Sequence, residues 1–225
     1  MKINKNISKT SYFEYHLRQY QEPYRSTVAL INFLKKRIPN QSFYILDVGC
    51  GGGANIHWLK KYFPKWRFLG IDTDREVLKI AKKMQKGKEG VEFREINFLE
   101  SEDYFPKKSF DYINAIQFIS FIDVDFSIFL EKALTLARKG IFLTSLFSEG
   151  WIEQYTTALD LKENWKGIYK IYSLERFRET LRKIGGNKLS LEYEKFDIDI
   201  DLPKPIKPKF GTYTEKTEKG KRLQI

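Results

Sequence analysis

The sequence contains little of what disulfide bonds or metal sites require. Of its 225 residues one is cysteine, Cys50, so no intrachain disulfide can form. The two histidines, His16 and His57, lie far apart in the sequence and accompany no group of cysteines, so we expect no metal site. Without an activating base beside it, Cys50 is interpreted as a small packing residue rather than as a nucleophile.

Long apolar runs are also absent. No segment approaches the roughly 20 apolar residues that cross a membrane, and residues 1–10 are too polar for a signal peptide. We therefore expect a cytoplasmic protein that does not act at a membrane. A length of 225 residues suits one α/β domain.

Negative charge is scarce, with 40 Lys and Arg against 29 Asp and Glu and a formal net charge of +11. An excess of basic residues can attract nucleic-acid phosphate. In this chain the lysines are dispersed along the polar faces and ends of predicted helices, which is typical of solvated surface. A nucleic-acid partner stays an alternative that we do not favour.

A junction rich in glycine is the most informative local pattern. Residues 44–48 are apolar apart from Asp47, and Gly49, Gly51 and Gly53 follow at alternate positions. Apolar residues then recur at helical spacing, namely Ile56, Leu59 and Phe63. Because glycine lets backbone approach a ligand closely, this strand, turn and helix predict a cofactor-binding loop.

Two classes of cofactor use such a loop. Gly49, Gly51 and Ala54 satisfy the loose dinucleotide pattern, with Asp72 near the place of a ribose ligand. However, Asp47 would lie close to the pyrophosphate of a dinucleotide, where two negative charges repel. A cofactor with no phosphate and a cationic amino acid end, such as S-adenosylmethionine, would be attracted instead.

The residues that favour this cofactor also resemble a known family. Residues 47–53, Asp-Val-Gly-Cys-Gly-Gly-Gly, resemble motif I of the class I S-adenosylmethionine-dependent methyltransferases. Residues 68–74, 91–98 and 110–118 are similar to the second, third and fourth strands of that family. The resemblance implies S-adenosylmethionine as cofactor, S-adenosylhomocysteine as product and no metal.

The same resemblance implies roles for particular residues. Asp72 would hold the ribose hydroxyls, and Asn97 would meet the adenine amino group where the family often has Asp. The full set of cofactor-binding residues expected is Asp47, Gly49, Cys50, Gly51, Gly53, Asp72, Thr73, Asn97, Phe98, Asn114, Gln117, Tyr24 and Arg25. Tyr24 or Arg25 would meet the methionine carboxylate from an N-terminal segment that covers the site.

Several of these residues also have an ordinary structural interpretation. Asp72 or Asp74 could cap the helix that follows, and Asn97 could serve as a turn residue. Gln117 could bond the backbone of its own loop rather than a substrate. The glycine run itself could merely pack a helix on a strand.

Alternating strands and helices predict a three-layer, doubly wound α/β fold with a mostly parallel sheet. The resemblance implies that this fold is Rossmann-like and has antiparallel C-terminal strands. The predicted strands are 43–48, 67–71, 91–96, 112–116 and 140–146. Predicted helices cover 26–36 and the regions around Leu59, Leu78, Phe129 and Phe177. One domain over 1–225 is expected, with a helical lid over 1–40, a cofactor core over 41–147, an aromatic insertion over 148–172 and a C-terminal part over 173–225.

Three segments outside the core are expected to govern substrate recognition. Residues 12–25 are interpreted as the lid, and the aromatic insertion as one wall of an acceptor pocket. The prolines of residues 202–208 predict an extended stretch. Residues 212–225 predict a β-hairpin at the edge of the sheet. The resemblance implies an antiparallel pair at the end of the sheet, and the last strands, from about Leu189 and from this tail, would form it.

The predicted activity is methyl transfer to a small-molecule or glycan-type acceptor on oxygen, nitrogen or carbon. Residues 114–117 lack the two prolines that amino-group methylases of nucleic-acid bases carry there. If the acceptor needs a base, His16 and then Glu149 are the candidates. The alternatives are an RNA methyltransferase, an NAD(P)-dependent oxidoreductase and a non-catalytic cofactor-binding protein.

Overall fold

The computed structural model describes residues 9–100, 104–161, 165–196, 214–216 and 222–224. By the packing of its Cα atoms, the chain divides into two units, Met1–Glu194 and Lys195–Ile225. In the second unit, β9 (Thr214–Lys216) pairs antiparallel with β10 (Arg222–Gln224). All further elements belong to the first unit.

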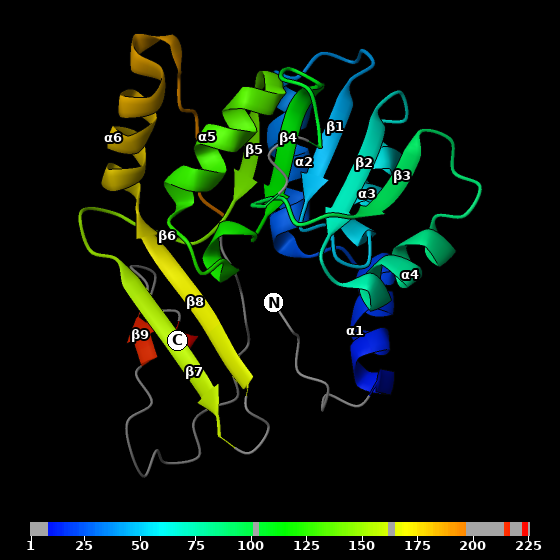
Figure 1. Ribbon diagram of the computed structural model, residues 1–225, viewed down its shortest axis with the longest axis horizontal. Helices are drawn as coiled ribbons and strands as arrows, with labels where there is room; N and C mark the ends of the chain where they lie inside the picture. The colour runs from blue at the N-terminus through cyan, green and yellow to red at the C-terminus, as the bar shows by residue number, and fades with distance from the viewer. Residues whose placement is uncertain (1–8, 101–103, 162–164, 197–213, 217–221, 225) are drawn as a thin grey trace. The chain divides into compact units, whose positions relative to one another are not determined.

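A five-stranded parallel sheet forms the centre of the first unit (Figure 1). Its strands are β1 (Tyr44–Val48), β2 (Arg67–Asp72), β3 (Val91–Glu95), β4 (Phe110–Ile116) and β5 (Ala137–Thr144). The order is β3-β2-β1-β4-β5, with every neighbouring pair parallel. This confirms the predicted fold class. Because the chain crosses to the other side of β1 when it enters β4, the carboxyl ends of β1 and β4 flank the position where ligands bind in such sheets.

Helices cover both faces of this sheet. The helices are α1 (Lys9–Gln21), α2 (Arg25–Arg37), α3 (Ala54–Tyr62), α4 (Arg75–Met84), α5 (Phe126–Leu136) and α6 (Leu174–Gly185). Consecutive strand residues point to opposite faces. Accordingly, buried Ile45 packs with apolar residues of α2, α3 and α4, and buried Leu46 packs with those of α5 and α6. No helix in the described part of the chain is long and apolar enough to cross a membrane.

The predicted aromatic insertion is a β-hairpin. After β6 (Phe147–Ser148), β7 (Gln154–Asp160) pairs antiparallel with β8 (Trp165–Ser173), and β6 pairs with the end of β8. These strands form a sheet of their own in the order β6-β8-β7. Figure 1 shows the hairpin extending away from the central sheet.

The predicted C-terminal β-hairpin is confirmed as β9 and β10, but the predicted strand from about Leu189 and the placement of the hairpin in the central sheet were wrong. Residues 189–196 form no strand, and β9 and β10 form a separate two-stranded sheet instead of extending the parallel one. Glu192 and Glu194 pair instead with Arg37 of α2, at 2.8 Å and 3.0 Å, while Tyr193 is 47% exposed. The segment therefore buries no apolar face that would fix it in a sheet. The stretch 202–208 lies outside the described residues.

Candidate cofactor and acceptor site

The glycine loop between β1 and α3 adopts a backbone that other residues rarely tolerate. Gly49, Gly51 and Gly53 have φ angles of 68°, 53° and 80°. A Cβ atom added at Gly49 would lie 2.6 Å from the ring of Phe118, and one at Gly53 would lie 2.9 Å from the ring of Phe93. Both the backbone conformation and the surrounding side chains therefore require glycine here.

Asp47 and Asn114 form a buried polar pair beside this loop. They are direct neighbours in the register of β1 and β4, and each is 1% exposed. The Asn114 amide Nδ2 donates to Asp47 Oδ1 at 2.6 Å. Within the described part of the chain, Asp47 Oδ2 and Asn114 Oδ1 have no hydrogen-bond partner. Two buried acceptor oxygens thus call for a donor that the described residues do not supply.

Burial decides the ionisation of Asp47. Burial, together with the smaller effect of the nearby charge of Asp72, raises the pKa of the carboxyl to about 7 against the opposing effect of the bond from Asn114. A cationic donor next to Asp47 would favour the ionised form. The site therefore fits a positively charged amino group and disfavours a phosphate.

Asp72, at the end of β2, ties the glycine loop to the next turn. Its carboxylate accepts the N–H groups of Gly51 and Asp74, both at 2.9 Å. Asp74 caps α4 by accepting from Glu76 and Val77. The capping role therefore falls to Asp74. A carboxylate has about four lone-pair sites, so Asp72 keeps acceptor capacity for hydroxyl donors.

At the end of β3, Asn97 takes the turn role that was left open. Its Oδ1 accepts the N–H of Leu99 at 3.1 Å, and a carbonyl oxygen can accept a second donor. Phe98 is 2% exposed and packs edge-on to Phe118 and against the ring of Phe129. Phe98 is therefore a core residue behind the site, whereas Thr73 in the preceding turn is exposed.

Helix α1 lies directly on the glycine loop. His16 is 8% exposed, and a Cβ atom at Gly52 would come within 2.9 Å of its Nδ1. One helical turn later, the Tyr20 hydroxyl donates to the carbonyl of Gly52 at 2.6 Å. Sequence reasoning did not assign Tyr20 to the site, although its spacing of four residues from His16 places both side chains on one face of a helix. Burial lowers the pKa of His16, so its imidazole is neutral near pH 7.

The other N-terminal candidates lie at the start of α2. There the Thr27 hydroxyl contacts Asn55 at the start of α3, at 2.5 Å, which brings the beginnings of the two helices together. Tyr24 is half-buried, with its ring centroid 6.2 Å from that of Tyr15, and Arg25 is exposed. Glu149 is exposed in the turn between β6 and β7.

The loop after β4 has a strained backbone. Gln117 has a φ of 58°, and its N–H donates to the carbonyl of Thr144 at the end of β5 at 2.7 Å. A left-handed conformation in a residue other than glycine costs energy and is found often at ligand sites. The next residue, Phe118, packs on Gly49, so this loop and the glycine loop are in contact.

The β7–β8 hairpin is anchored to the segment that follows this loop. The Tyr172 hydroxyl donates to the carbonyl of Ile119 at 3.3 Å, and the ring of Tyr169 lies 5.5 Å from that of Phe121. Lys170 donates to the carbonyl of Val124 at 3.1 Å. The base of the hairpin is thereby fixed beside the carboxyl end of β4.

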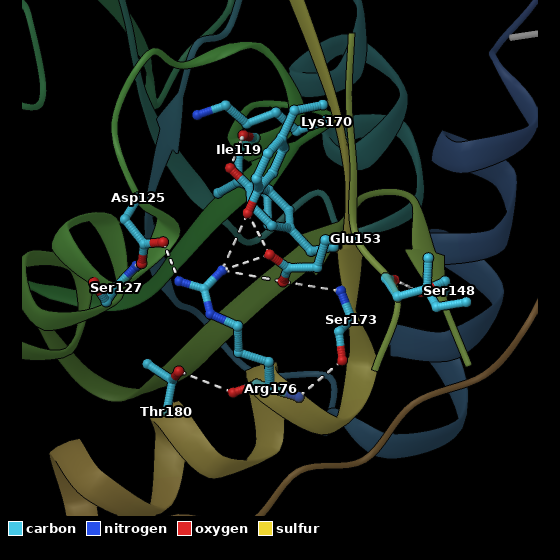
Figure 2. A network of polar contacts seen from close by, with 12 residues as sticks. Ile119, Asp125, Ser127, Ser148, Glu153, Lys170, Ser173, Arg176 and Thr180 are labelled. Carbon is cyan, nitrogen blue, oxygen red and sulfur yellow. Dashed lines mark hydrogen bonds and ion pairs between the residues drawn. The ribbon is translucent and has the colours of Figure 1, made fainter. Parts of the chain in front are cut away.

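Arg176 of α6 stands at the centre of the polar network that holds the hairpin (Figure 2). Its guanidinium bonds both carboxylate oxygens of Glu153, at 3.0 Å and 2.8 Å, and also Asp125, which caps α5. Glu153 in turn accepts the N–H of Ser173 at 3.1 Å and the hydroxyl of Tyr155. The network joins α5, α6 and the start of the hairpin, and nothing in the sequence pattern predicted it.

Comparisons with known proteins agree with this geometry. Residues 46–142 match the family model described as a methyltransferase domain. The chain is 30% identical over 153 residues to the probable methyltransferase ltbC of Aspergillus luteorubrus, which covers 63% of this chain and 50% of that protein. It is 34% identical over 85 residues to malonyl-[acyl-carrier protein] O-methyltransferase of Priestia megaterium. This alignment covers 36% of this chain and 31% of that protein. The chain thus spans half or less of the length of these curated relatives.

The fold also matches solved structures. A SAM-dependent methyltransferase from Aquifex aeolicus superposes with a TM-score of 0.54 at 18% identity, covering 77% of this chain and 87% of that one. The sheet order and the glycine loop are typical of folds that bind a nucleoside cofactor. The family match indicates that the fold here is that of a methyltransferase. The match over residues 46–142 and the named relatives therefore support a class I S-adenosylmethionine-dependent methyltransferase domain in this part of the chain. This confirms the predicted resemblance and its cofactor, S-adenosylmethionine.

Proposed function

We propose that this protein transfers the methyl group of S-adenosylmethionine to a small-molecule or glycan-type acceptor. The main support for the cofactor is the buried pair of Asp47 and Asn114 beside the glycine loop. Among the described residues, Asp47 Oδ2 and Asn114 Oδ1 have no hydrogen-bond donor, so a ligand could supply one. The cofactor, when bound, supplies a methyl group on a cationic sulfonium that moves to a nucleophile by in-line displacement. The chain's own contribution is to bind, align and exclude water.

The residues present divide the binding task by chemistry. Asp47 and Asn114 would hold the cationic amino group, and Asp72 would accept from the ribose hydroxyls. Asn97 would meet the adenine amine with the second lone pair of its oxygen. From α1, His16 and Tyr20 cover the glycine loop and shield it from water.

The hairpin supports an organic acceptor. Its base places the half-buried ring of Tyr169 against Phe121, in the segment that follows β4. Two further aromatic side chains of the region from β6 to β7 are exposed, Trp151 at 64% and Tyr155 at 57%. Aromatic walls with few fixed polar groups suit small organic ligands. We assign residues 148–173 to the acceptor side of the site.

Proton removal from the acceptor would fall to a side chain near the loop after β4. His16 is neutral near pH 7 and so has the protonation state of a general base, although it faces the glycine loop. Glu149 lies in the turn that leads into the hairpin. We keep both as candidates, and the pH dependence of turnover on a known acceptor would separate them.

The oxidoreductase alternative is disfavoured by charge. Asp47 lies beside the glycine loop, so a pyrophosphate bound there would face its buried carboxyl group. RNA as acceptor stays open because of the net charge of +11, and the experiment below includes it.

The test has two stages. The purified protein is titrated by calorimetry with S-adenosylmethionine, S-adenosylhomocysteine and NADH, together with Asp47→Ala and Asp72→Ala. We expect saturable binding of the two sulfur nucleotides that weakens in both variants, and no binding of NADH. Methyl transfer from labelled S-adenosylmethionine is then screened against metabolites, glycans and total RNA. Binding of NADH alone would contradict the proposal, and transfer to RNA alone would replace its acceptor.

A further inference from the structure

A basic groove lies at the end of the sheet opposite the glycine loop. It has a volume of about 690 Å³ and is lined by Lys60, Pro64, Lys65, Arg67, Lys88, Glu89 and Gly90. These residues come from the end of α3, the start of β2 and the turn before β3. Helix α3 has nine residues and spans about 13 Å between the glycine loop and this groove. The groove is therefore a place distinct from the site of methyl transfer.

Two of the cations are held in fixed positions by neutral groups. Lys60 Nζ donates to the carbonyls of Pro64 and Trp66, at 2.8 Å and 2.7 Å. An ammonium has three donors, so one is left for a ligand in the groove. The guanidinium of Arg67 lies over the ring of Tyr44, 4.9 Å from its centroid.

Lys88 is held in a similar way. Its ammonium lies 2.8 Å from Nδ1 of His57. Burial lowers the pKa of His57, and the charges of Lys88 and Lys61 lower it further, so the imidazole accepts this bond as a neutral group. The positive charge of Lys88 is thus positioned without being cancelled.

The charge of the groove is left largely uncompensated. Among the described residues, none of the four cations Lys60, Lys65, Arg67 and Lys88 forms an ion pair, and Glu89 is the one acidic residue of the lining. Other basic residues of this fold do have carboxylate partners, as Arg37 and Arg176 do. A second hollow of about 270 Å³ shares Lys88 and adds Lys82 and Lys86 to the same surface.

We infer that this groove binds the phosphate groups of a ligand. Preorganised ammonium and guanidinium groups around a concave surface are the arrangement that recognises phosphate. Gly90 keeps the floor open, since a Cβ atom there would lie 3.2 Å from the Arg67 side chain and 3.4 Å from Lys60 Nζ. The inference adds a site to the proposed function and does not depend on it.

The test compares two double variants that remove the same charge. Lys65→Gln/Lys88→Gln alters the groove, and Lys107→Gln/Lys183→Gln alters exposed lysines elsewhere. The full-length chain is titrated with inorganic pyrophosphate and with a 12-nucleotide single-stranded RNA at constant ionic strength, by calorimetry and by the amide NMR signal of Gly90. Circular dichroism verifies that each variant is folded.

We expect binding to weaken at least tenfold in the groove variant and to stay within twofold in the control. If pyrophosphate binds in this pattern, the groove accepts the phosphate groups of a small ligand. If only RNA does so, the phosphates belong to a nucleic-acid backbone. Equal weakening in both variants, or no binding of either probe to the unaltered protein, would overturn the inference. S-adenosylmethionine affinity should be the same in both variants, so this test and that of the proposed function can fail separately.

Discussion

Replacing Asp47 by Asn should stabilise the fold and weaken the site at the same time. In the folded chain the pKa of Asp47 is about 7, against an ordinary value of 3.8. A carboxyl whose pKa is raised on folding lowers stability as pH rises, because the unfolded chain ionises first. The penalty starts near pH 4, grows to pH 7 and is constant above. An Asn side chain does not ionise and escapes it.

The expected magnitude follows from the two pKa values. At about 1.4 kcal/mol per pH unit, the penalty is about 2 kcal/mol at pH 5 and about 4 kcal/mol at pH 8. The gain in unfolding free energy of Asp47→Asn over the unaltered protein should therefore grow by about 2 to 3 kcal/mol between these pH values. Titrating groups common to both proteins cancel in this difference.

Urea unfolding followed by circular dichroism at pH 5 and pH 8 measures this gain in unfolding free energy directly. A gap between the two proteins that does not change with pH would refute the reasoning, since it would mean that Asp47 ionises in the folded chain as it does in the unfolded one. The size of the gap at a single pH also reflects the altered contact with Asn114, so the change with pH is the decisive quantity.

The same substitution should harm cofactor binding. Loss of a charge-assisted hydrogen bond costs about 1.5 to 3 kcal/mol, so the Kd for S-adenosylmethionine should rise by a factor of about 10 to 150. In the unaltered protein, affinity should increase with pH up to about 7, because the cationic amino group favours ionised Asp47. Calorimetry at pH 5.5 and pH 7, where the amino group of the cofactor stays largely protonated, tests this, and equal affinities would remove Asp47 from the binding site.

Three further predictions concern the loop, the ribose ligand and the hairpin. Asp72→Asn should weaken S-adenosylmethionine binding by about 1 to 3 kcal/mol in calorimetry, while Asp74→Asn, which keeps the helix cap, should not. Gly49→Ala should lower the unfolding free energy by about 1 to 3 kcal/mol more than Gly87→Ala, which has a positive φ but open space around it, and equal losses would contradict the packing argument. Arg176→Met should cost about 1 to 2 kcal/mol and expose the β7–β8 hairpin to limited proteolysis; an unchanged digestion pattern would mean that the network does not hold the hairpin.

Local patterns in the sequence were enough for the cofactor half of the molecule. Short apolar runs between helical patterns predicted all five parallel strands. A strand that is buried on both faces has a continuous run of apolar residues. The glycines and Asp47 predicted the loop, since positive φ and close approach restrict the residue type to glycine. These properties depend on a few neighbouring residues, which is why they can be read without the fold.

Features that depend on distant contacts could not be predicted in this way. The sequence placed a strand near Leu189, but Glu192 and Glu194 pair with α2, and antiparallel pairing occurs in the hairpins instead. Likewise, the network around Arg176 joins residues up to 51 positions apart. Ion pairs of this kind have no period or spacing, so only the folded chain reveals them.

The sequence by itself determined the strand-loop-helix unit, the identity of its glycines and the carboxylates at the ends of β1 and β2, because each is a local demand of backbone geometry or charge. Only the tertiary structure decided what those groups face. It paired Asp47 with Asn114 across two strands, laid α1 on the glycine loop and gathered four dispersed cations into one groove. Burial and proximity set the pKa of Asp47 and the field of the groove, and both are properties of the packed chain rather than of any segment.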